Sequence, residues 1–222
     1  MIRLVVFDLD GTLVDSSHDL AEATNALLAE LGGAPLALDA VVSMVGEGAA
    51  VLVKRALERS GLDPEMPGAL ARFLELYDER LLNATRPYPG MIEAIAALGA
   101  KFRLAVLTNK PERPTLEILS GLQMRQFFDD VTGGDSAHGR KPSPAGLLDL
   151  AARAGVAASE TILVGDSPVD LETSRRAGTR ICLTRYGFGY RFAGTEFRGD
   201  EVFVDEAAEL PGAIGLVSAG SG

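Results

Sequence analysis

Short apolar runs separated by helix-patterned stretches dominate the chain. The runs are Leu4–Phe7, Arg103–Leu107, Asp130–Thr132, Thr161–Val164 and Arg180–Leu183, with a weaker one at Glu201–Val204. Runs of this kind are typical of strands that are buried on both faces of a parallel sheet. Their alternation with helical stretches predicts an α/β fold with a Rossmann-like, doubly wound parallel sheet as its core.

The first interval between strands is far longer than the others. Residues 8–102, about 95 positions, separate the first two runs, whereas a crossover between parallel strands needs only about a dozen. The interval carries four helical patterns, at Asp19–Leu31, Asp39–Val45, Ala49–Ser60 and Pro67–Asn83. We therefore expect residues 16–85 to form an inserted all-helical cap and residues 1–15 and 86–222 to form the core. The alternative is that these helices simply widen the core.

Composition narrows the classes of partner. The chain has 222 residues, 47% of them hydrophobic, and a formal net charge of −10. This acidity disfavours nucleic-acid binding, which needs a basic surface. No apolar run reaches the roughly 18 residues of a membrane helix, so we expect no membrane association. An anionic substrate stays compatible with the charge if cations are concentrated at the site, and no protein partner is inferred.

The single cysteine and the two ends of the chain complete this picture. Cys182 lies within an apolar run, so we interpret it as core filling. One cysteine excludes an internal disulfide framework and fits a reducing compartment. Met1 leads directly into the first strand without a basic leader, so we expect a cytoplasmic protein. Residues 218–222 predict a disordered tail.

Two acids follow the first strand. Asp8 and Asp10 stand one residue apart and Gly11 comes next, at a strand end where ligands bind in open α/β sheets. At about 4 Å and an effective dielectric of about 20, their mutual repulsion costs roughly 4 kcal/mol, which indicates a nearby cation. An ordinary turn is the alternative. A calcium loop is excluded because the glycine is at the fourth position and Asp19 stands where a glutamate is needed.

The other strand ends carry complementary groups. Thr108 and Asn109 follow the second run, Lys141 precedes a predicted helix near Pro144, and Asp166 and Asp170 follow the Thr161–Val164 run. Each group has an ordinary alternative: Thr108 as a helix cap, Lys141 as a solvated charge, Asp170 as a charge at a helix start. Together they favour phosphate chemistry, in which a carboxylate is the nucleophile and Mg²⁺ offsets repulsion.

The motifs Asp8–Thr12, Thr108–Lys110, Lys141-Pro142 and Gly165–Asp170 resemble, in this order, those of the haloacid dehalogenase superfamily. The resemblance covers nearly the whole chain, and it implies both the fold and a helical cap after the first motif. It implies that Asp8 is the nucleophile that forms an aspartyl-phosphate.

Further roles follow from the same resemblance. Asp10 would protonate the leaving group and then activate water. Thr108 and Lys141 would hold the phosphoryl oxygens. Asp166 would ligate Mg²⁺ together with Asp8 and the backbone carbonyl of Asp10, and Asp170 would be a further metal ligand or support the metal site.

Several stretches resemble more narrowly the bacterial phosphoglycolate phosphatases within that superfamily. They are Gly46–Val53, Leu107–Pro111, Gly133–Asp135 and Leu183–Tyr190, the last departing from the usual pattern at Arg185. The resemblance implies a Mg²⁺-dependent phosphatase of a small phosphate ester, with 2-phosphoglycolate as the leading substrate. It places Gly46, Glu47, Gly48, Asn109 and Arg55 near the substrate; the alternative for residues 46–48 is a bare turn between two helices.

Other activities stay open on the residues alone. Related sugar-phosphate phosphatases, pyrophosphatases and phosphomutases share parts of these stretches, and a phosphomutase would keep both Asp8 and Asp10. A dehalogenase is disfavoured because halide departure needs no acid such as Asp10. A non-catalytic binding protein on this fold would be expected to lack the nucleophile or the metal acid. A Ser-His hydrolase is disfavoured because the chain contains no G-x-S-x-G, and His18 and His138 fit a surface role better.

Overall fold

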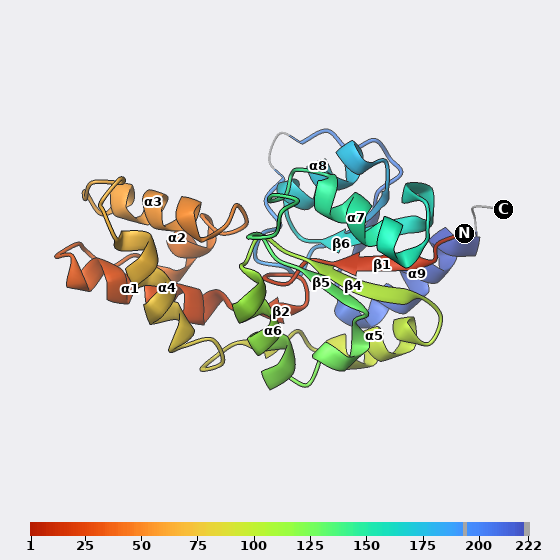
Figure 1. The fold of residues 1–222 in the computed structure, drawn as a ribbon, viewed down its shortest axis with the longest axis horizontal. Coiled ribbons are helices and arrows are strands. Elements are labelled where there is room, and N and C mark those ends of the chain that lie inside the picture. The colour runs from red at the N-terminus through yellow and green to blue at the C-terminus, as the bar shows by residue number, and fades with distance from the viewer. Residues whose placement is uncertain (193–194, 220–222) are drawn as a thin grey trace.

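A parallel sheet forms the centre of the computed structural model, which describes residues 1–192 and 195–219 (Figure 1). Its strands are β1 Leu4–Phe7, β4 Arg103–Leu107, β5 Asp130–Thr132, β6 Thr161–Gly165, β7 Arg180–Thr184 and β8 Val202–Val204, in the order β5-β4-β1-β6-β7-β8. Every neighbouring pair is parallel. The predicted α/β, Rossmann-like fold is confirmed, and each predicted strand is found to within one residue.

Helices cover both faces of this sheet and fill the long first interval (Figure 1). They are α1 Ser17–Glu30, α2 Leu38–Val42, α3 Ala49–Arg59, α4 Ala69–Asp78, α5 Met91–Gly99, α6 Glu112–Gly121, α7 Ala145–Ala154, α8 Pro168–Ala177 and α9 Leu210–Ala219, with 3₁₀ turns η1 Arg125–Phe127, η2 Ala158–Glu160 and η3 Ala207–Glu209. Among the helices in the described ranges, none combines the length and apolar character that crossing a membrane requires.

Two predicted helices are longer than the observed ones. The prediction over Asp39–Val45 corresponds to α2, which ends at Val42, and the prediction over Pro67–Asn83 corresponds to α4, which covers only Ala69–Asp78. Beyond each end the chain continues in tighter i→i+3 turns, such as Val45 N to Val42 O and Asn83 N to Arg80 O. Such turns keep an apolar spacing close to that of a helix, which explains the overestimate.

The predicted disordered tail is also partly wrong. Ser218 and Ala219 belong to α9, and the Ser218 hydroxyl accepts a hydrogen bond from the backbone N–H of Ile2 at 3.1 Å. The rest of that tail, residues 220–222, lies outside the described residues. Cys182 is buried and free, as its interpretation as core filling requires.

Strand β1 divides the core into two apolar layers. Val5 and Phe7 belong to a large cluster that includes α5 and α9, whereas Leu4 and Val6 belong to a second cluster with α7 and α8. Successive side chains of a strand point to opposite faces, so a run that is apolar at every position packs against helices on both sides. The buried run therefore fixes β1 at the centre, and the carboxyl ends of β4, β1 and β6 adjoin one another.

Helices α1–α4 lie together beyond this carboxyl edge, at the left of Figure 1. The chain leaves and returns through a short antiparallel pair of strands, β2 Val14–Asp15 and β3 Arg86–Pro87. The large apolar cluster runs without interruption from the sheet into these helices, with Leu13, Leu20 and Phe73 among its members.

Asp19 fastens the two connections of this helical region to each other. Its side chain is fully buried near the start of α1 and accepts hydrogen bonds from Ala84 N, Thr85 N and the Thr85 hydroxyl at 2.7–3.0 Å. Buried polar groups must find a partner, and here the buried N–H and hydroxyl of Thr85 find it, with the part-buried Ala84 N–H, in a carboxylate from the start of α1.

We predict that Asp19→Ala lowers the free energy of unfolding by about 2–4 kcal/mol, because it leaves the buried N–H and hydroxyl of Thr85 and the part-buried N–H of Ala84 without this acceptor. The matched control is Glu22→Ala, an exposed position on the same helix, which should change the free energy by less than about 0.5 kcal/mol. Urea unfolding of the two variants measures the difference. Equal, small losses in both would show that Asp19 does not fasten the two connections.

Candidate active site

Asp8 stands directly beyond the last residue of β1 and is held by backbone groups. Its N–H donates to Val164 O at 2.9 Å, which continues the pairing of β1 with β6 for one more residue. Its Oδ1 accepts from Leu9 N at 2.7 Å. The carboxylate is therefore fixed at the carboxyl edge of the sheet, where the sequence analysis expects it.

Lys141 joins two of the predicted acids. Its Nζ lies 2.9 Å from Asp8 Oδ1 and 2.6 Å from Asp170 Oδ1, and its side chain is only 1% exposed. Burial opposes the charge of the ammonium group, but the two carboxylates outweigh burial and raise the pKa of Lys141. The alternative of a solvated surface lysine is therefore excluded.

Asn109 positions Lys141 through its backbone. The Asn109 Oδ1 accepts from Lys141 N at 2.7 Å, and the Asn109 Nδ2 donates to Lys141 O at 3.0 Å. The same Nδ2 also donates to Gly46 O at 2.9 Å, in the loop before α3. One side chain thus connects the loop of Lys141 to the helical region.

Asp166 and Asp170 complete a group of three buried carboxylates. Asp8, Asp166 and Asp170 each offer one oxygen, and these oxygens lie within 4.8 Å of one another. Asp170 also accepts from Ser167 N at 3.1 Å and from the Ser167 hydroxyl at 2.5 Å in a capping box at the start of α8. Asp170 therefore both caps the start of α8 and belongs to the group of three carboxylates.

Glycine backbone surrounds Asp166. An added Cβ would lie 2.0 Å from Asp166 Oδ2 if it were on Gly11, 2.2 Å from Asp166 Cβ on Gly187 and 2.8 Å from Asp166 Oδ2 on Gly189. Gly189 N donates to Asp166 Oδ2 at 2.7 Å. The close approach of three glycines leaves the carboxylate enclosed by backbone, and no side chain fits at these positions.

The electrostatics of this group call for a cation. Burial, opposed by Lys141 and reinforced by Asp170, raises the pKa of Asp8 to about 6. Burial and the neighbouring Asp170 and Asp8 raise the pKa of Asp166 well above its usual value. At an effective dielectric of about 20, each pair of these charges costs roughly 4 kcal/mol. A divalent cation offsets that cost, and carboxylate oxygens are the donors that Mg²⁺ prefers, so the residues fit the predicted metal.

Asp10 has different partners. Its two carboxylate oxygens lie 2.8 and 2.9 Å from Lys110 Nζ, and the Ser16 hydroxyl donates to Oδ1 at 2.6 Å. Its side chain is not in the group formed by Asp8, Asp166 and Asp170. Lys110 Nζ also donates to the hydroxyl of Tyr77, a residue of α4, at 2.8 Å. The carboxylate of Asp10 thus faces the helical region instead of the acidic group.

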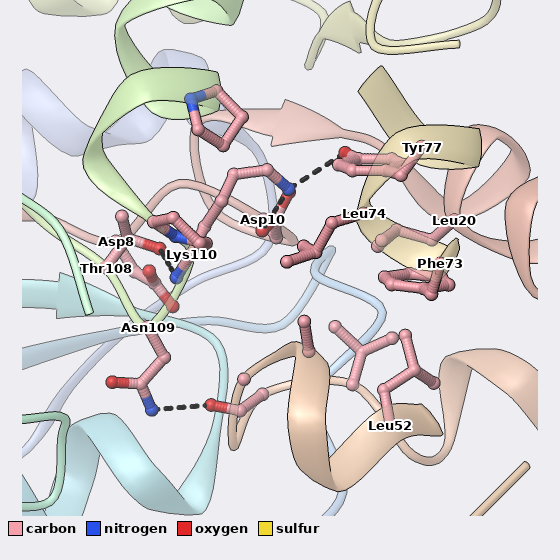
Figure 2. Close-up of a pocket in the computed structure, with 16 residues that line it drawn as sticks. Asp8, Asp10, Leu20, Leu52, Phe73, Leu74, Tyr77, Thr108, Asn109 and Lys110 are labelled. Atoms are coloured by element: carbon pink, nitrogen blue, oxygen red, sulfur yellow. Dashed lines mark hydrogen bonds and ion pairs between the residues drawn. The ribbon is translucent and has the colours of Figure 1, made fainter. Parts of the chain in front are cut away.

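A pocket opens over Asp8 and Asp10 (Figure 2). Thr108, Asn109 and Lys110 line its floor from the sheet side, and Gly46 and Gly48 line it from the loop before α3. Helices α1, α3 and α4 add an apolar wall that consists of Leu20, Ala49, Leu52, Phe73 and Leu74. The volume of the cavity is about 50 Å³, room for only a few atoms since one water needs about 10–15 Å³ on this measure.

Two predicted substrate contacts lie elsewhere. Glu47 and Arg55 pair with each other at 2.6 Å with half-exposed side chains, and neither is among the residues that line the pocket. The structure therefore does not bring them to Asp8. Their part in substrate binding stays a prediction.

Sequence reasoning missed two of the polar residues that line the pocket, Lys110 and Tyr77. The sequence contained an indication that Lys110 belongs to the site, because Lys110 directly follows Thr108 and Asn109 at the end of β4. The sequence contained no such indication for Tyr77, since a tyrosine on an amphipathic helix is typically part of the core.

The Leu183–Tyr190 stretch lies next to the acidic group. The Tyr186 hydroxyl donates to Thr12 O at 3.0 Å, and the loop that follows Tyr186 covers Asp166 through Gly187 and Gly189. Arg185 pairs with Asp205 at 3.2 Å and lies over the Phe203 ring. Its contacts thus connect the ends of β7 and β8.

Comparisons with known proteins agree with this geometry. Residues 5–184 match the model of the haloacid dehalogenase-like hydrolases. The phosphoglycolate phosphatase of Rhodospirillum rubrum is 44% identical over 196 residues, which cover 85% of this chain and 81% of that protein. The phosphoglycolate phosphatase of Nitrosospira multiformis is 41% identical, with 84% and 85% covered.

Solved structures show the same fold. A predicted phosphoglycolate phosphatase from Haemophilus somnus superposes with a TM-score of 0.86 at 30% identity, over 98% of both chains. CbbY from Rhodobacter sphaeroides, in complex with phosphate, gives a TM-score of 0.78 at 26% identity over 95% of this chain and 96% of that one. With a family model that spans most of its length and relatives above 40% identity, the chain belongs to the haloacid dehalogenase-like hydrolases.

Proposed function

We propose that this enzyme, a phosphatase of its family, hydrolyses a small phosphate monoester through a phosphorylated Asp8, with Mg²⁺ as cofactor and 2-phosphoglycolate as substrate. One observation carries the proposal: Lys141 is buried against Asp8 inside a group of three carboxylates. A cation and an adjacent acidic metal site are what a carboxylate needs in order to approach an anionic phosphoryl group.

The reaction has two steps on the residues of this chain. A carboxylate oxygen of Asp8 attacks phosphorus, and the bond from phosphorus to the ester oxygen breaks while Asp10 gives that oxygen a proton. Asp10 then takes a proton from water, which attacks the phosphorus of the aspartyl-phosphate and releases inorganic phosphate and the free Asp8 carboxylate. Thr108 and Lys141 hold the phosphoryl oxygens, and positioning with charge neutralisation supplies most of the rate enhancement.

The carboxylates of Asp8, Asp166 and Asp170, with the backbone carbonyl of Asp10, are the groups that would hold Mg²⁺. When bound, the ion neutralises charge on the phosphoryl oxygens and on the nucleophile. The glycines around Asp166 keep that carboxylate enclosed and so define the size of the site.

The size of the pocket supports a small substrate. A cavity of about 50 Å³ under an apolar wall accommodates an organic part of a few atoms, which agrees with the names of the relatives. We assign residues 16–85 as a cap that excludes water from the aspartyl-phosphate. The free, buried Cys182 fits a reducing cytoplasm as the place of action.

The direct test replaces the nucleophile. Asp8→Asn should abolish release of inorganic phosphate from 2-phosphoglycolate, because a neutral amide cannot form the aspartyl-phosphate, while circular dichroism shows an unchanged fold. Asp39→Asn, an exposed acid on α2, is the matched control and should keep full turnover. Retained turnover in Asp8→Asn would exclude the covalent route. Conversion of a sugar phosphate into its isomer by the wild type, without phosphate release, would indicate a mutase.

Removal of the buried cation should be nearly as damaging. Lys141→Ala should lower kcat/KM by about 100- to 1000-fold, the usual effect of removing one group that neutralises a developing anion. Lys101→Ala, at an exposed position, should leave kcat/KM unchanged. Steady-state kinetics on both variants provide the measurement, and a kcat/KM for Lys141→Ala within threefold of wild type would remove Lys141 from the site.

Stability should depend on pH through Asp8. Its pKa is 3.8 ordinarily and about 6 in the folded protein, where burial raises it. A carboxyl whose pKa is raised by folding stabilises the fold while protonated, so its contribution is present below about pH 4 and is lost as the pH rises through 6. Metal-free wild type should therefore lose stability relative to Asp8→Asn over that range.

Urea unfolding of both proteins in the presence of a chelator, at a series of pH values, measures this difference. Added Mg²⁺ should stabilise the wild type most at pH 7, where Asp8 is charged. A difference between the two proteins that is constant from pH 4 to 7 would contradict the account.

A further inference from the structure

Lys110 is a buried cation that the chemistry at phosphorus does not use. Its side chain is 5% exposed, and among the described residues that line the pocket it is the only cationic one. Burying an ammonium group is costly unless it is paired. Asp10 supplies that pairing, but pairing alone does not explain why the ammonium group stands against the apolar wall, where a ligand must pass.

The partner of Lys110 in the helical region is equally informative. Tyr77 OH accepts from Lys110 Nζ at 2.8 Å, and no acceptor for its own hydrogen is found among the described residues. Burial raises the pKa of Tyr77 to about 12, so the hydroxyl stays protonated. The pocket therefore presents a charged donor and a neutral O–H donor side by side, one from the loop after β4 and one from α4 (Figure 2).

Two adjacent donors, one of them charged, are complementary to a carboxylate, whose two oxygens accept only. The other walls near them, Leu20, Phe73 and Leu74, offer no competing donor. Because this spot is water-poor and bounded by apolar groups, an unpaired carboxylate could not enter it without these donors.

The position along the reaction axis is also defined. Asp10, which faces the leaving oxygen in the proposed mechanism, lies 2.8 Å from Lys110 Nζ. A group bound by Lys110 and Tyr77 would therefore lie near the ester oxygen that Asp10 protonates. In 2-phosphoglycolate, a single methylene separates the ester oxygen from the carboxylate, so the carboxylate of this substrate also lies near its ester oxygen.

We infer that Lys110 and Tyr77 form the carboxylate-binding subsite of the pocket and determine its specificity for 2-phosphocarboxylates. This inference rests on the proposed phosphatase function. A substrate carboxylate accepts from the Tyr77 hydroxyl and from the Lys110 N–H that now donates to Tyr77, while Lys110 keeps its contact with Asp10. The subsite is shared between the sheet and α4, so it is complete only when both are in place.

The test compares two substrates of matched length, 2-phosphoglycolate and 2-hydroxyethyl phosphate, in which a neutral hydroxymethyl group replaces the carboxylate. Wild type should prefer 2-phosphoglycolate in kcat/KM. Lys110→Met should reduce this preference by about 10- to 100-fold, the loss expected for a hydrogen bond to a charged group. Lys110→Arg should restore part of it, and Tyr77→Phe, which removes one oxygen and keeps the ring, should reduce it by about fivefold to tenfold. Lys101→Met is the surface control.

The ratio of the two substrates separates specificity from catalysis, because any disturbance of Asp10 lowers both rates together. An equal fall for both substrates in Lys110→Met and Tyr77→Phe would overturn the inference and make Lys110 a positioning residue for Asp10. If Lys110→Met does not fold, two measurements on Tyr77→Phe decide. One is its ratio of kcat/KM for the two substrates, and the other is inhibition by glycolate, which should be weaker in Tyr77→Phe than in wild type. A wild type that hydrolyses both esters equally would overturn the subsite and leave the phosphatase proposal intact. A wild type that hydrolyses neither would overturn both.

Discussion

Lys141 allows acids that repel one another to share a buried site. Its ammonium group bonds Asp8 and Asp170 at once, at 2.9 and 2.6 Å, and so offsets part of the repulsion among the three carboxylates. The remaining negative charge is what a divalent cation would neutralise in the proposed mechanism. The loop that carries Lys141 is in turn held by both ends of the Asn109 amide. Burial raises the pKa of Asp8, and Lys141 opposes this rise.

The sheet brings these groups together through its strand order. Strands β4, β1 and β6 are neighbours, so residues about 100 and 160 positions apart along the chain end at one edge. Apolar side chains on both faces fix each strand. The polar residue directly after each strand then faces the site at the carboxyl edge of the sheet. The burial of apolar strand residues therefore determines the architecture. The first polar residues after the strands determine the chemistry of the site.

This division explains what could be predicted from the sequence. The strands and the strand-end acids Asp8 and Asp166 followed from local patterns, because an unbroken apolar run followed by an acid has few interpretations. The contact between Lys110 and Tyr77 did not, since it depends on how α4 packs over the sheet. Helix ends at α2 and α4 were overestimated because tight turns keep a helical spacing. The pairing of Arg55 with Glu47 also depends on tertiary structure, and their residue types alone gave no sign of it.

The helical region and the sheet meet at polar contacts as well as apolar ones. Asn109 reaches Gly46 and Lys110 reaches Tyr77, both from the loop after β4. In the proposed mechanism, this loop therefore lies between the phosphoryl group on one side and the organic part of the substrate on the other. A substrate that fits both sides would place its ester oxygen at Asp10, so the proposal links substrate recognition to proton transfer.

The most direct measurement of the central claim is chemical trapping of the phosphorylated enzyme. Wild type is mixed with 2-phosphoglycolate and Mg²⁺, quenched during the first turnover and treated with borohydride, which reduces an acyl phosphate to an alcohol. The account predicts that peptide mass spectrometry finds homoserine at position 8, and that omission of substrate prevents its formation. Phosphate release at the same rate with Asp8 unmodified, or modification of a different acid, would contradict the account.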